Sequence, residues 1–191
     1  MPQSLKVNCC VIGDGQSNFV SLALFNSGID KIISVNLPEV LLNDLTLLQK
    51  LRPNQDEYVL VETKKDLNTA LNSKNVKIIF VSANDSSILF KANIFLFVNI
   101  ASMQEMKLAS ISEYFNIIKS NKAYFYCCNR DEKILSGGEK ILFGKYPWGK
   151  YKLLLEGLPQ WHQFYYKLSF QNFKIKHLYN GVHKHKLVKY N

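Results

Sequence analysis

The stretch VNCCVIGDGQSN, residues 7–18, decides the fold. Its first six residues form an apolar run typical of a buried strand, and Gly13 and Gly15 follow where that strand must turn sharply. A helical segment comes next, and a second apolar run, KIISVN at residues 31–36, follows it. Strand, glycine turn, helix and strand in this order predict the βαβ unit of a nucleotide-cofactor domain.

The glycine turn and the end of the second strand carry groups that can bind a cofactor. Glycine lets the backbone approach a ligand closely, and the helix that follows presents amide groups and the positive end of its dipole. Asn36 stands where such domains usually carry Asp or Glu for the ribose hydroxyls, and its amide can also form hydrogen bonds. The third glycine of the dinucleotide fingerprint is replaced by Asn18, so a plain turn in another α/β protein stays open as the alternative.

Strand-like and helix-like segments continue to alternate as far as Cys128. The pattern predicts a helix that begins near Pro38 and carries Leu41, Leu45 and Leu48 on one face. Further strands are predicted at residues 57–62, 76–82, 94–98 and 122–128, and further helices at residues 65–73 and 108–118. We therefore expect an α/β fold with a Rossmann-like, doubly wound and mainly parallel sheet.

Ligands of such sheets bind at the carboxyl ends of the strands. Gly13, Asn36, Asn84 and Asn99 fall at these ends in the predicted arrangement. Beyond Cys128, the Gly137-Gly138 turn predicts a hairpin within residues 129–143, and the aromatic-rich segment after it is expected to fold over the carboxyl edge of the sheet. These aromatic rings suit stacking on a sugar or simple core packing.

Composition narrows the class of protein. The net charge is +9, but the excess is mostly lysine and no RNA-binding signature is present, so we expect a solvated surface and no dedicated nucleic-acid binding. The cysteines form two adjacent pairs, Cys9–Cys10 and Cys127–Cys128, which predict small buried side chains and no metal site. Neither a transmembrane segment nor a signal peptide is recognised, so a cytoplasmic protein is expected.

Six motifs together resemble those of S-adenosylmethionine-dependent sugar O-methyltransferases found in bacterial surface-polysaccharide clusters. The resemblance covers residues 7–170, and its most specific parts are the SxQEM and WHQxYY segments. The matching positions are Gly13-Asp14-Gly15, Asn36-Leu37-Pro38-Glu39, residues 99–106 (NIASMQEM), Cys128-Asn129-Arg130, Tyr146-Pro147-Trp148 and residues 159–166 (PQWHQFYY).

The resemblance implies methyl transfer from a sulfonium to a sugar hydroxyl, which requires close positioning and a base that accepts the hydroxyl proton. His162 and Glu105 are the candidate catalytic bases. The resemblance places S-adenosylmethionine against Gly13, Asp14, Gly15 and Asn36, with Asn84 and Asp85 near the adenine and Asn99 near the methionine part. Candidate substrate-binding residues are Gln104, Asn129, Arg130, Trp148, Trp161 and Gln163.

Structural roles compete with these functional ones. A histidine between Trp161 and Gln163 is often a satisfied structural residue, and Glu105 can instead favour the dipole of a following helix. Arg130 is expected to pair with Glu105 or another acid. The histidines of the basic tail, His177, His183 and His185, are expected to be solvated.

The resemblance implies a single methyltransferase-like domain over residues 1–191, with a cofactor-binding core at residues 1–128 and a hairpin and acceptor-side extension at residues 129–191. The partner would be a sugar or glycan acceptor, and the chain could form a homodimer. Two alternatives remain open: a catalytically degenerate relative with a binding or assembly role, favoured by Val11, Ser17 and Asn36, and another α/β protein that binds a nucleotide or nucleotide-sugar.

Overall fold

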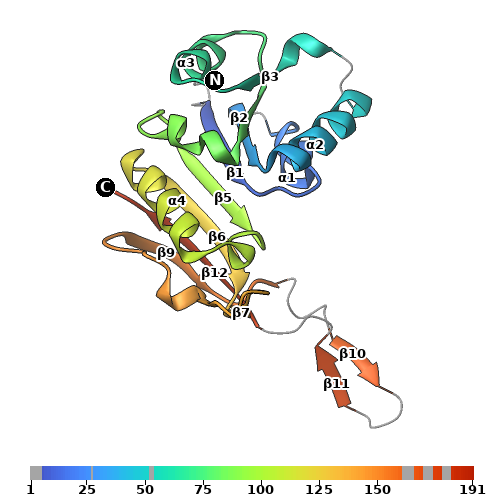
Figure 1. Cartoon of the computed structure of the whole chain (residues 1–191), viewed down its shortest axis with the longest axis vertical. Helices are drawn as coiled ribbons and strands as arrows, with labels where there is room; N and C mark the ends of the chain where they lie inside the picture. Colours follow the sequence, from blue (N-terminus) through green and yellow to red (C-terminus); the bar gives the residue numbers. More distant parts are fainter. Residues whose placement is uncertain (1–5, 27, 52–53, 161–165, 170–173, 178–181) are drawn as a thin grey trace, which may run out of the picture.

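A single eight-stranded sheet runs through the computed structural model of the chain (Figure 1). The structure describes residues 6–26, 28–51, 54–160, 166–169, 174–177 and 182–191. The strand order is β3-β4-β2-β1-β5-β6-β12-β9, and the first six strands are parallel. Their bounds are β1 Val7–Ile12, β2 Ile29–Asn36, β3 Tyr58–Val61, β4 Ile78–Ser82, β5 Leu96–Ile100 and β6 Tyr124–Arg130.

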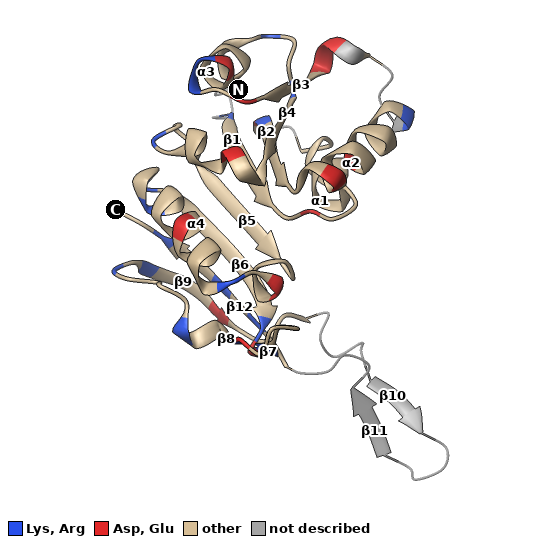
Figure 2. Cartoon of the chain, viewed as in Figure 1, with Lys and Arg blue, Asp and Glu red and all other residues tan. Residues whose placement is uncertain are grey.

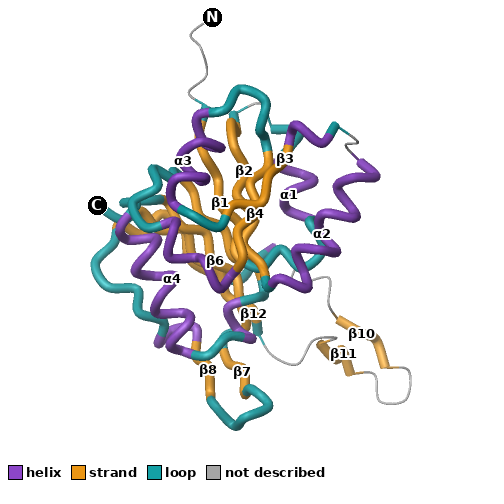
Figure 3. The backbone as a smooth tube through the Cα atoms, turned by 45° about the horizontal axis from the view of Figure 1, so that its top comes forward, coloured by secondary structure: helices purple, strands orange, loops and turns teal. Residues whose placement is uncertain are grey.

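Helices cover both faces of the parallel strands (Figure 3). On one face, α1 (Asn18–Ala23) and α2 (Pro38–Leu51) enclose a core that includes Val20, Leu41 and Leu48. On the other face, α3 (Lys64–Asn72) and α4 (Leu108–Ser120) pack over a larger core. The chain is therefore a doubly wound α/β protein, and the Rossmann-like fold predicted from the sequence is confirmed.

Short elements connect this framework. Four 3-10 helices occur in the described residues: η1 Gln55–Glu57, η2 Ala83–Leu89, η3 Met103–Glu105 and η4 Phe143–Lys145. The predicted hairpin is present as β7 (Glu132–Ile134) and β8 (Lys140–Leu142). A second hairpin pairs β10 (Tyr166–Ser169) with β11 (Lys174–His177).

The expectation that the segment after the first hairpin folds over the carboxyl edge is wrong for its two long strands. β12 (His183–Lys189) pairs antiparallel with β6, and β9 (Lys152–Gly157) pairs antiparallel with β12. Both strands extend the sheet sideways, because β6 presents an edge whose backbone groups need partners. The nearby aromatic rings pack in the core beneath α4, where Trp148 lies edge-on to Phe115 at 5.1 Å between centroids.

Basic and acidic residues are spread over several elements instead of one face (Figure 2). Two lysines of β12 lie over aromatic rings: Lys186 Nζ is 4.9 Å from the centroid of Trp148, and Lys189 Nζ is 4.6 Å from that of Tyr124. These lysines pack their stems on the protein and stabilise it through cation–π contacts. None of the helices in the described part of the chain has the length and apolar character needed to cross a membrane.

All four cysteines are free and buried, as predicted. Burial raises the pKa of Cys9 to about 12 and that of Cys128 to about 11, and it also raises the pKa values of Cys10 and Cys127. Thiols with such pKa values stay protonated at neutral pH and are poor nucleophiles. The cysteines act as small apolar side chains within β1 and β6.

Candidate functional site

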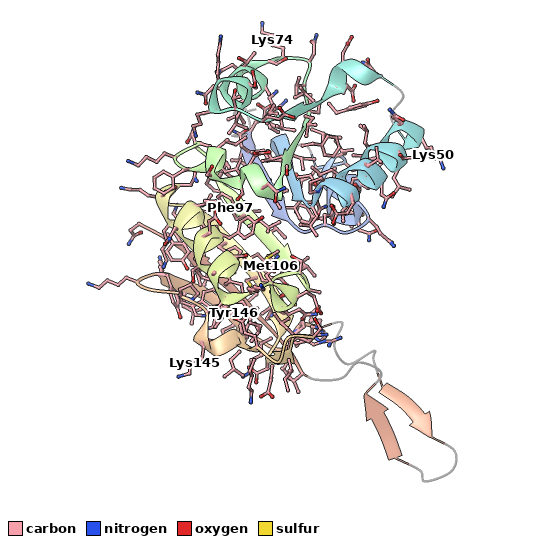
Figure 4. All side chains as sticks on the ribbon, in the orientation of Figure 1. Lys50, Lys74, Phe97, Met106, Lys145 and Tyr146 are labelled. Carbon is pink, nitrogen blue, oxygen red and sulfur yellow. The ribbon has the colours of Figure 1, made fainter. Side chains whose placement is uncertain are left out.

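A cavity of about 1160 Å³ lies at the carboxyl ends of the parallel strands. Its walls come from the β1–α1 turn, the end of β2, the start of η2, the loop after β5 and the first half of α4. Figure 4 shows Met106, one of the lining residues, beside the carboxyl end of β5. This is the place where an open parallel sheet binds ligands, as the sequence predicted.

The glycine turn lines this cavity with backbone. Gly13 has φ +74°, and its amide donates to the carbonyl of Val35 at 2.8 Å, which joins the end of β1 to β2. A Cβ atom at Gly13 would overlap the side chain of Ser102. Gly15 has φ +39°, and a Cβ there would meet nothing within 4 Å. Gly13 is thus required by a close approach within the protein, whereas Gly15 leaves open space for a ligand.

Asp14 closes the start of α1. Its two carboxylate oxygens accept hydrogen bonds from the amides of Phe19 and Val20, both at 2.8 Å. Burial raises the pKa of Asp14, the two amides oppose this shift, and the charge of Asp44 adds to it. The side chain takes the amides that would otherwise bind an anionic ligand. The sequence predicted free amides here, and this expectation is wrong for these two groups.

Asn36 ends β2 and lines the cavity. Its Nδ2 atom donates to Oδ2 of Asp44 on α2 at 2.7 Å. The side chain of Asp44 is fully buried, and its Oδ1 atom has no hydrogen-bond partner within the described residues. Asn36 therefore lines the cavity, and its side chain is hydrogen-bonded to Asp44 on the side away from the cavity. The sequence analysis did not identify Asp44.

The opposite wall comes from η2 and α4. Asn84 lines the cavity as predicted, but Asp85 does not. Ser86 and Tyr114 line it instead, and burial raises the pKa of Tyr114 to about 12, so its hydroxyl stays protonated at neutral pH. The one-residue shift arises because η2 is a 3-10 helix that turns Asp85 away from the cavity.

A buried network of amide side chains supports the loop after β5. Asn99 Nδ2 donates to the carbonyl of Ile12 at 2.8 Å, and Asn129 Nδ2 donates to Asn99 Oδ1 at 2.7 Å. Asn129 Oδ1 accepts from the amide of Gln104 at 3.1 Å, and Gln104 Oε1 accepts from the amide of Arg130 at 2.7 Å. The network joins β1, β5, β6 and η3, so it holds Glu105 and Ser102 at the cavity wall.

Glu105 lies between two cavities. It lines the large cavity and also a smaller one of about 590 Å³, which is formed with the β7–β8 hairpin. Its side chain is half exposed, and Oε1 lies 3.2 Å from Nζ of Lys133. Glu139 of the hairpin accepts a hydrogen bond from the amide of Leu108 at 3.1 Å and so fastens the hairpin to the start of α4. The carboxylate of Glu105 therefore borders both cavities.

Several predicted binding residues lie beneath the site and not in it. None of these residues lines either cavity: Asn99, Gln104, Asn129, Arg130 and Trp148. The three amide side chains are buried because they satisfy one another and the backbone. Trp148 is buried in the aromatic core, where its Nε1 donates to the carbonyl of Phe143 at 3.1 Å, so it has no free face for a sugar. Glu105 pairs with Lys133, whereas Arg130 was expected to pair with Glu105 or another acid.

Three predicted residues, Trp161, His162 and Gln163, fall outside the described residues. Other polar residues that line the large cavity were missed by the sequence analysis: Gln16, Ser86, Ser102, Ser110, Glu113 and Tyr114. The helical period of α4 had identified its buried face but not which turn of that face reaches the cavity. Ser102 was part of the quoted NIASMQEM motif, and its close approach to Gly13 is visible only in three dimensions.

Comparison with known proteins finds similarity in structure only. No protein-family model matches the sequence, and no curated protein matches it either. Among solved structures, the methyltransferase domain of bacterial CtHen1-CN aligns with a TM-score of 0.53 and 11% identity, over 95% of this chain and 89% of that chain. An S-adenosylmethionine-dependent methyltransferase from Mesorhizobium loti aligns at 0.52 and 8% identity, over 99% and 93%.

The rRNA methyltransferase aviRa from Streptomyces viridochromogenes also aligns, with a TM-score of 0.51, 11% identity and coverage of 99% of this chain and 78% of that chain. These similarities show that the described part of the chain shares the Rossmann-like fold of these structures. Because fold does not determine substrate, the chemistry has to be argued from the site.

Proposed function

We propose that this chain is an S-adenosylmethionine-dependent O-methyltransferase that acts on a sugar hydroxyl of a surface glycan or its precursor. The observation that carries the proposal is that Asp14 occupies amides at the start of α1, while the neighbouring turn at Gly15 has free space beside its backbone. Asp14 occupies the amides of Phe19 and Val20, and it would repel a phosphate placed there. The cavity therefore favours a nucleoside cofactor that carries no phosphate over a dinucleotide or a nucleotide-sugar.

The residues present fit S-adenosylmethionine. A cavity of about 1160 Å³ has ample room for a ligand of this size. Gly15 leaves open space beside the backbone, and Asn36 presents its amide at the end of β2 for ribose hydroxyls. Asn84 and Ser86 offer polar groups on the η2 wall for the adenine.

Glu105 is the base of the proposed reaction. The bound cofactor supplies a methyl group on a sulfonium, which leaves as a neutral thioether when the acceptor oxygen forms its new bond to carbon. Glu105 accepts the hydroxyl proton in this step, because it is the carboxylate that lines both the large cavity and the smaller cavity. Lys133 holds the Glu105 carboxylate in position until the acceptor arrives.

The smaller cavity is the proposed acceptor site. Its lining contains two carboxylates and two ammonium groups, from Glu105, Glu139, Lys107 and Lys133, together with Ser136. This balanced set of donors and acceptors suits a neutral polyhydroxylated ligand. A polyanion such as RNA would meet two carboxylates here, which supports a sugar over the RNA acceptor named for aviRa.

Isothermal calorimetry with S-adenosylmethionine and S-adenosylhomocysteine tests the cofactor. We expect micromolar binding that Gly15→Val abolishes, because the branched side chain would strain the φ of +39° and enter the ligand space. Gly138→Val is the matched control, since Gly138 also has positive φ and open surroundings but lies in the hairpin turn. No binding at millimolar ligand, or tight binding of a nucleotide-sugar instead, would contradict the proposal and favour one of the two alternatives.

A radiolabelled methyl-transfer assay tests the acceptor. The chain is incubated with labelled S-adenosylmethionine and, in parallel, with a panel of neutral oligosaccharides or a ribosomal RNA fragment. Label in the saccharides supports the proposed acceptor. Label in the RNA alone would support methyltransferase activity and contradict the proposed sugar acceptor.

A further inference from the structure

We infer that Asp44 is a positioning residue, which orients Asn36 so that Oδ1 of Asn36 accepts a hydrogen bond from a cofactor ribose hydroxyl. The inference rests on the proposed function, because it concerns how the same cavity selects a ribose. It assigns a role to a side chain on α2 that lines no cavity itself.

The geometry fixes the orientation of the Asn36 amide. Asp44 Oδ2 lies 2.7 Å from Asn36 Nδ2. The Asn36 atom that faces this carboxylate oxygen is Nδ2, which donates to it. The other end of the amide, Oδ1, then points away from Asp44, and it accepts no hydrogen bond from the described part of the chain. Since Asn36 lines the cavity, this oxygen is the acceptor it offers to a ligand.

Asp44 is hard to explain as a stabilising residue. It is fully buried within the apolar face of α2, close in sequence to the buried Leu41 and Leu48. Its Oδ1 atom has no partner among the described residues. A buried carboxylate with one incomplete set of hydrogen bonds costs stability, which offsets the gain from its hydrogen bond with Asn36.

Asp44 also accounts for the amide at the end of β2. A carboxylate at position 36 would lie against the carboxylate of Asp44, and the two like charges would repel each other. An asparagine avoids this repulsion and donates to Asp44. The pair therefore divides the task of the usual acidic residue: α2 provides the charge, and β2 provides the atom that contacts the ribose.

Calorimetry with two ligands tests this role. S-adenosylhomocysteine and its 2′-deoxyribose analogue are titrated into the full chain and into Asp44→Leu, with Asn43→Leu, an exposed neighbour on α2, as the control. For Asp44→Leu we expect about a tenfold loss of affinity for S-adenosylhomocysteine and little change for the deoxy analogue, because one oriented hydrogen bond is lost. Thermal unfolding should show that Asp44→Leu remains folded, because removal of the buried carboxylate offsets the loss of the partner of Asn36 Nδ2.

A charge swap completes the test. The double variant Asn36→Asp, Asp44→Asn reverses the hydrogen bond and should recover the preference for the ribose, whereas Asn36→Asp alone should bind both ligands poorly. If the ratio of the two affinities in Asp44→Leu equals that of the wild-type chain, the inference is overturned and the proposed function stands. If the wild-type chain binds neither ligand, the proposed function and the inference fall together.

Discussion

The two halves of the cavity wall differ in how completely their polar groups are paired. On the half formed by the glycine turn, β2 and α2, Ser17 Oγ and Asp44 Oδ1 are buried without a hydrogen-bond partner in the described residues. On the half formed by β5, β6 and η3, every polar side-chain atom of Asn99, Gln104 and Asn129 has a partner. The first half leaves these two atoms unpaired behind the cavity, whereas the amide network of the second half is complete and only Arg130 Nε at its margin has no partner among the described residues.

This difference in pairing assigns a supporting role to the half formed by β5, β6 and η3. A fully paired buried network is rigid, because breaking any member leaves another polar group unsatisfied. The paired half can therefore hold Glu105 in place before a ligand arrives. The half with unpaired atoms carries a cost in stability, and both atoms belong to residues that stand behind the cavity lining. The following changes break or sharpen this comparison.

The largest effect is expected for Glu105→Gln on the paired half. The amide cannot accept the hydroxyl proton, so kcat for methyl transfer should fall by roughly 10²- to 10⁴-fold. Affinity for S-adenosylhomocysteine should not change, because the network beneath residue 105 is intact. Glu132→Gln, an exposed carboxylate of β7 that pairs with Lys140, is the control and should retain activity. Unchanged kcat in Glu105→Gln would exclude the residue as the base.

Gly13→Ala should damage both halves together, because this residue joins them. The new methyl group would overlap Ser102 and adopt a φ of +74°, and the cost should be about 3 kcal/mol in the free energy of unfolding. Cofactor binding should be lost as well. Gly138→Ala shares the positive φ but has open surroundings, so urea unfolding should show a cost of only about 1 kcal/mol. Equal costs would mean that the contact with Ser102 is unimportant.

Asn129→Ala tests the paired half by itself. It leaves the amide of Gln104 without its partner and removes one of the two donors to Asn99 Oδ1, so the free energy of unfolding should fall by about 2 kcal/mol. Asn72→Ala removes an exposed amide that contacts only its own helix, and this control should cost less than about 0.5 kcal/mol. A similar small cost for both variants, measured by urea unfolding, would show that the network is not cooperative.

Asp14→Asn gives the smallest effect, and it depends on pH. Because the pKa of Asp14 is raised in the folded chain, the folded state binds more protons than the unfolded state between the unfolded pKa and the folded pKa. The contribution of this group to stability is therefore present at low pH and is lost as the pH rises through the folded pKa.

Urea unfolding of the wild-type chain and Asp14→Asn at a series of pH values measures this contribution. The stability of the wild-type chain relative to the variant should increase as the pH falls from 7 toward 4. Ser112→Ala, an exposed position on α4, controls for general acid effects and should show no such trend. The opposite slope would mean that the two amide hydrogen bonds outweigh the burial of the carboxylate.

The fold could be predicted because its signals are local. The apolar run before Gly13, the leucine stripe after Pro38 and the alternation that follows each act over a few residues. The position of β12 could not be predicted in the same way. It inserts between β6 and β9 through pairing over long sequence separations, and a mixed strand such as HKHKLVK gives little periodic signal of its own.

Of the residues predicted for the site, some line the large cavity and others lie beneath it. Gly13, Gly15, Asn36, Asn84 and Glu105 line the large cavity, as expected of residues at strand ends. Asn99 and Asn129 occupy equivalent positions in sequence but point into the protein. A polar residue at a strand end has the same appearance in sequence whether it binds a ligand or a neighbouring amide, and only the register of β5 against β6 separates the two cases.

The burial of every native thiol makes the chain suitable for single-site labelling. A maleimide reacts with thiolates, and none of the four cysteines supplies one at neutral pH. A cysteine introduced at Ser136, on the tip of the β7–β8 hairpin, would then carry a fluorophore without background at other positions. Its emission would report directly on whether the hairpin approaches Glu105 when an acceptor enters.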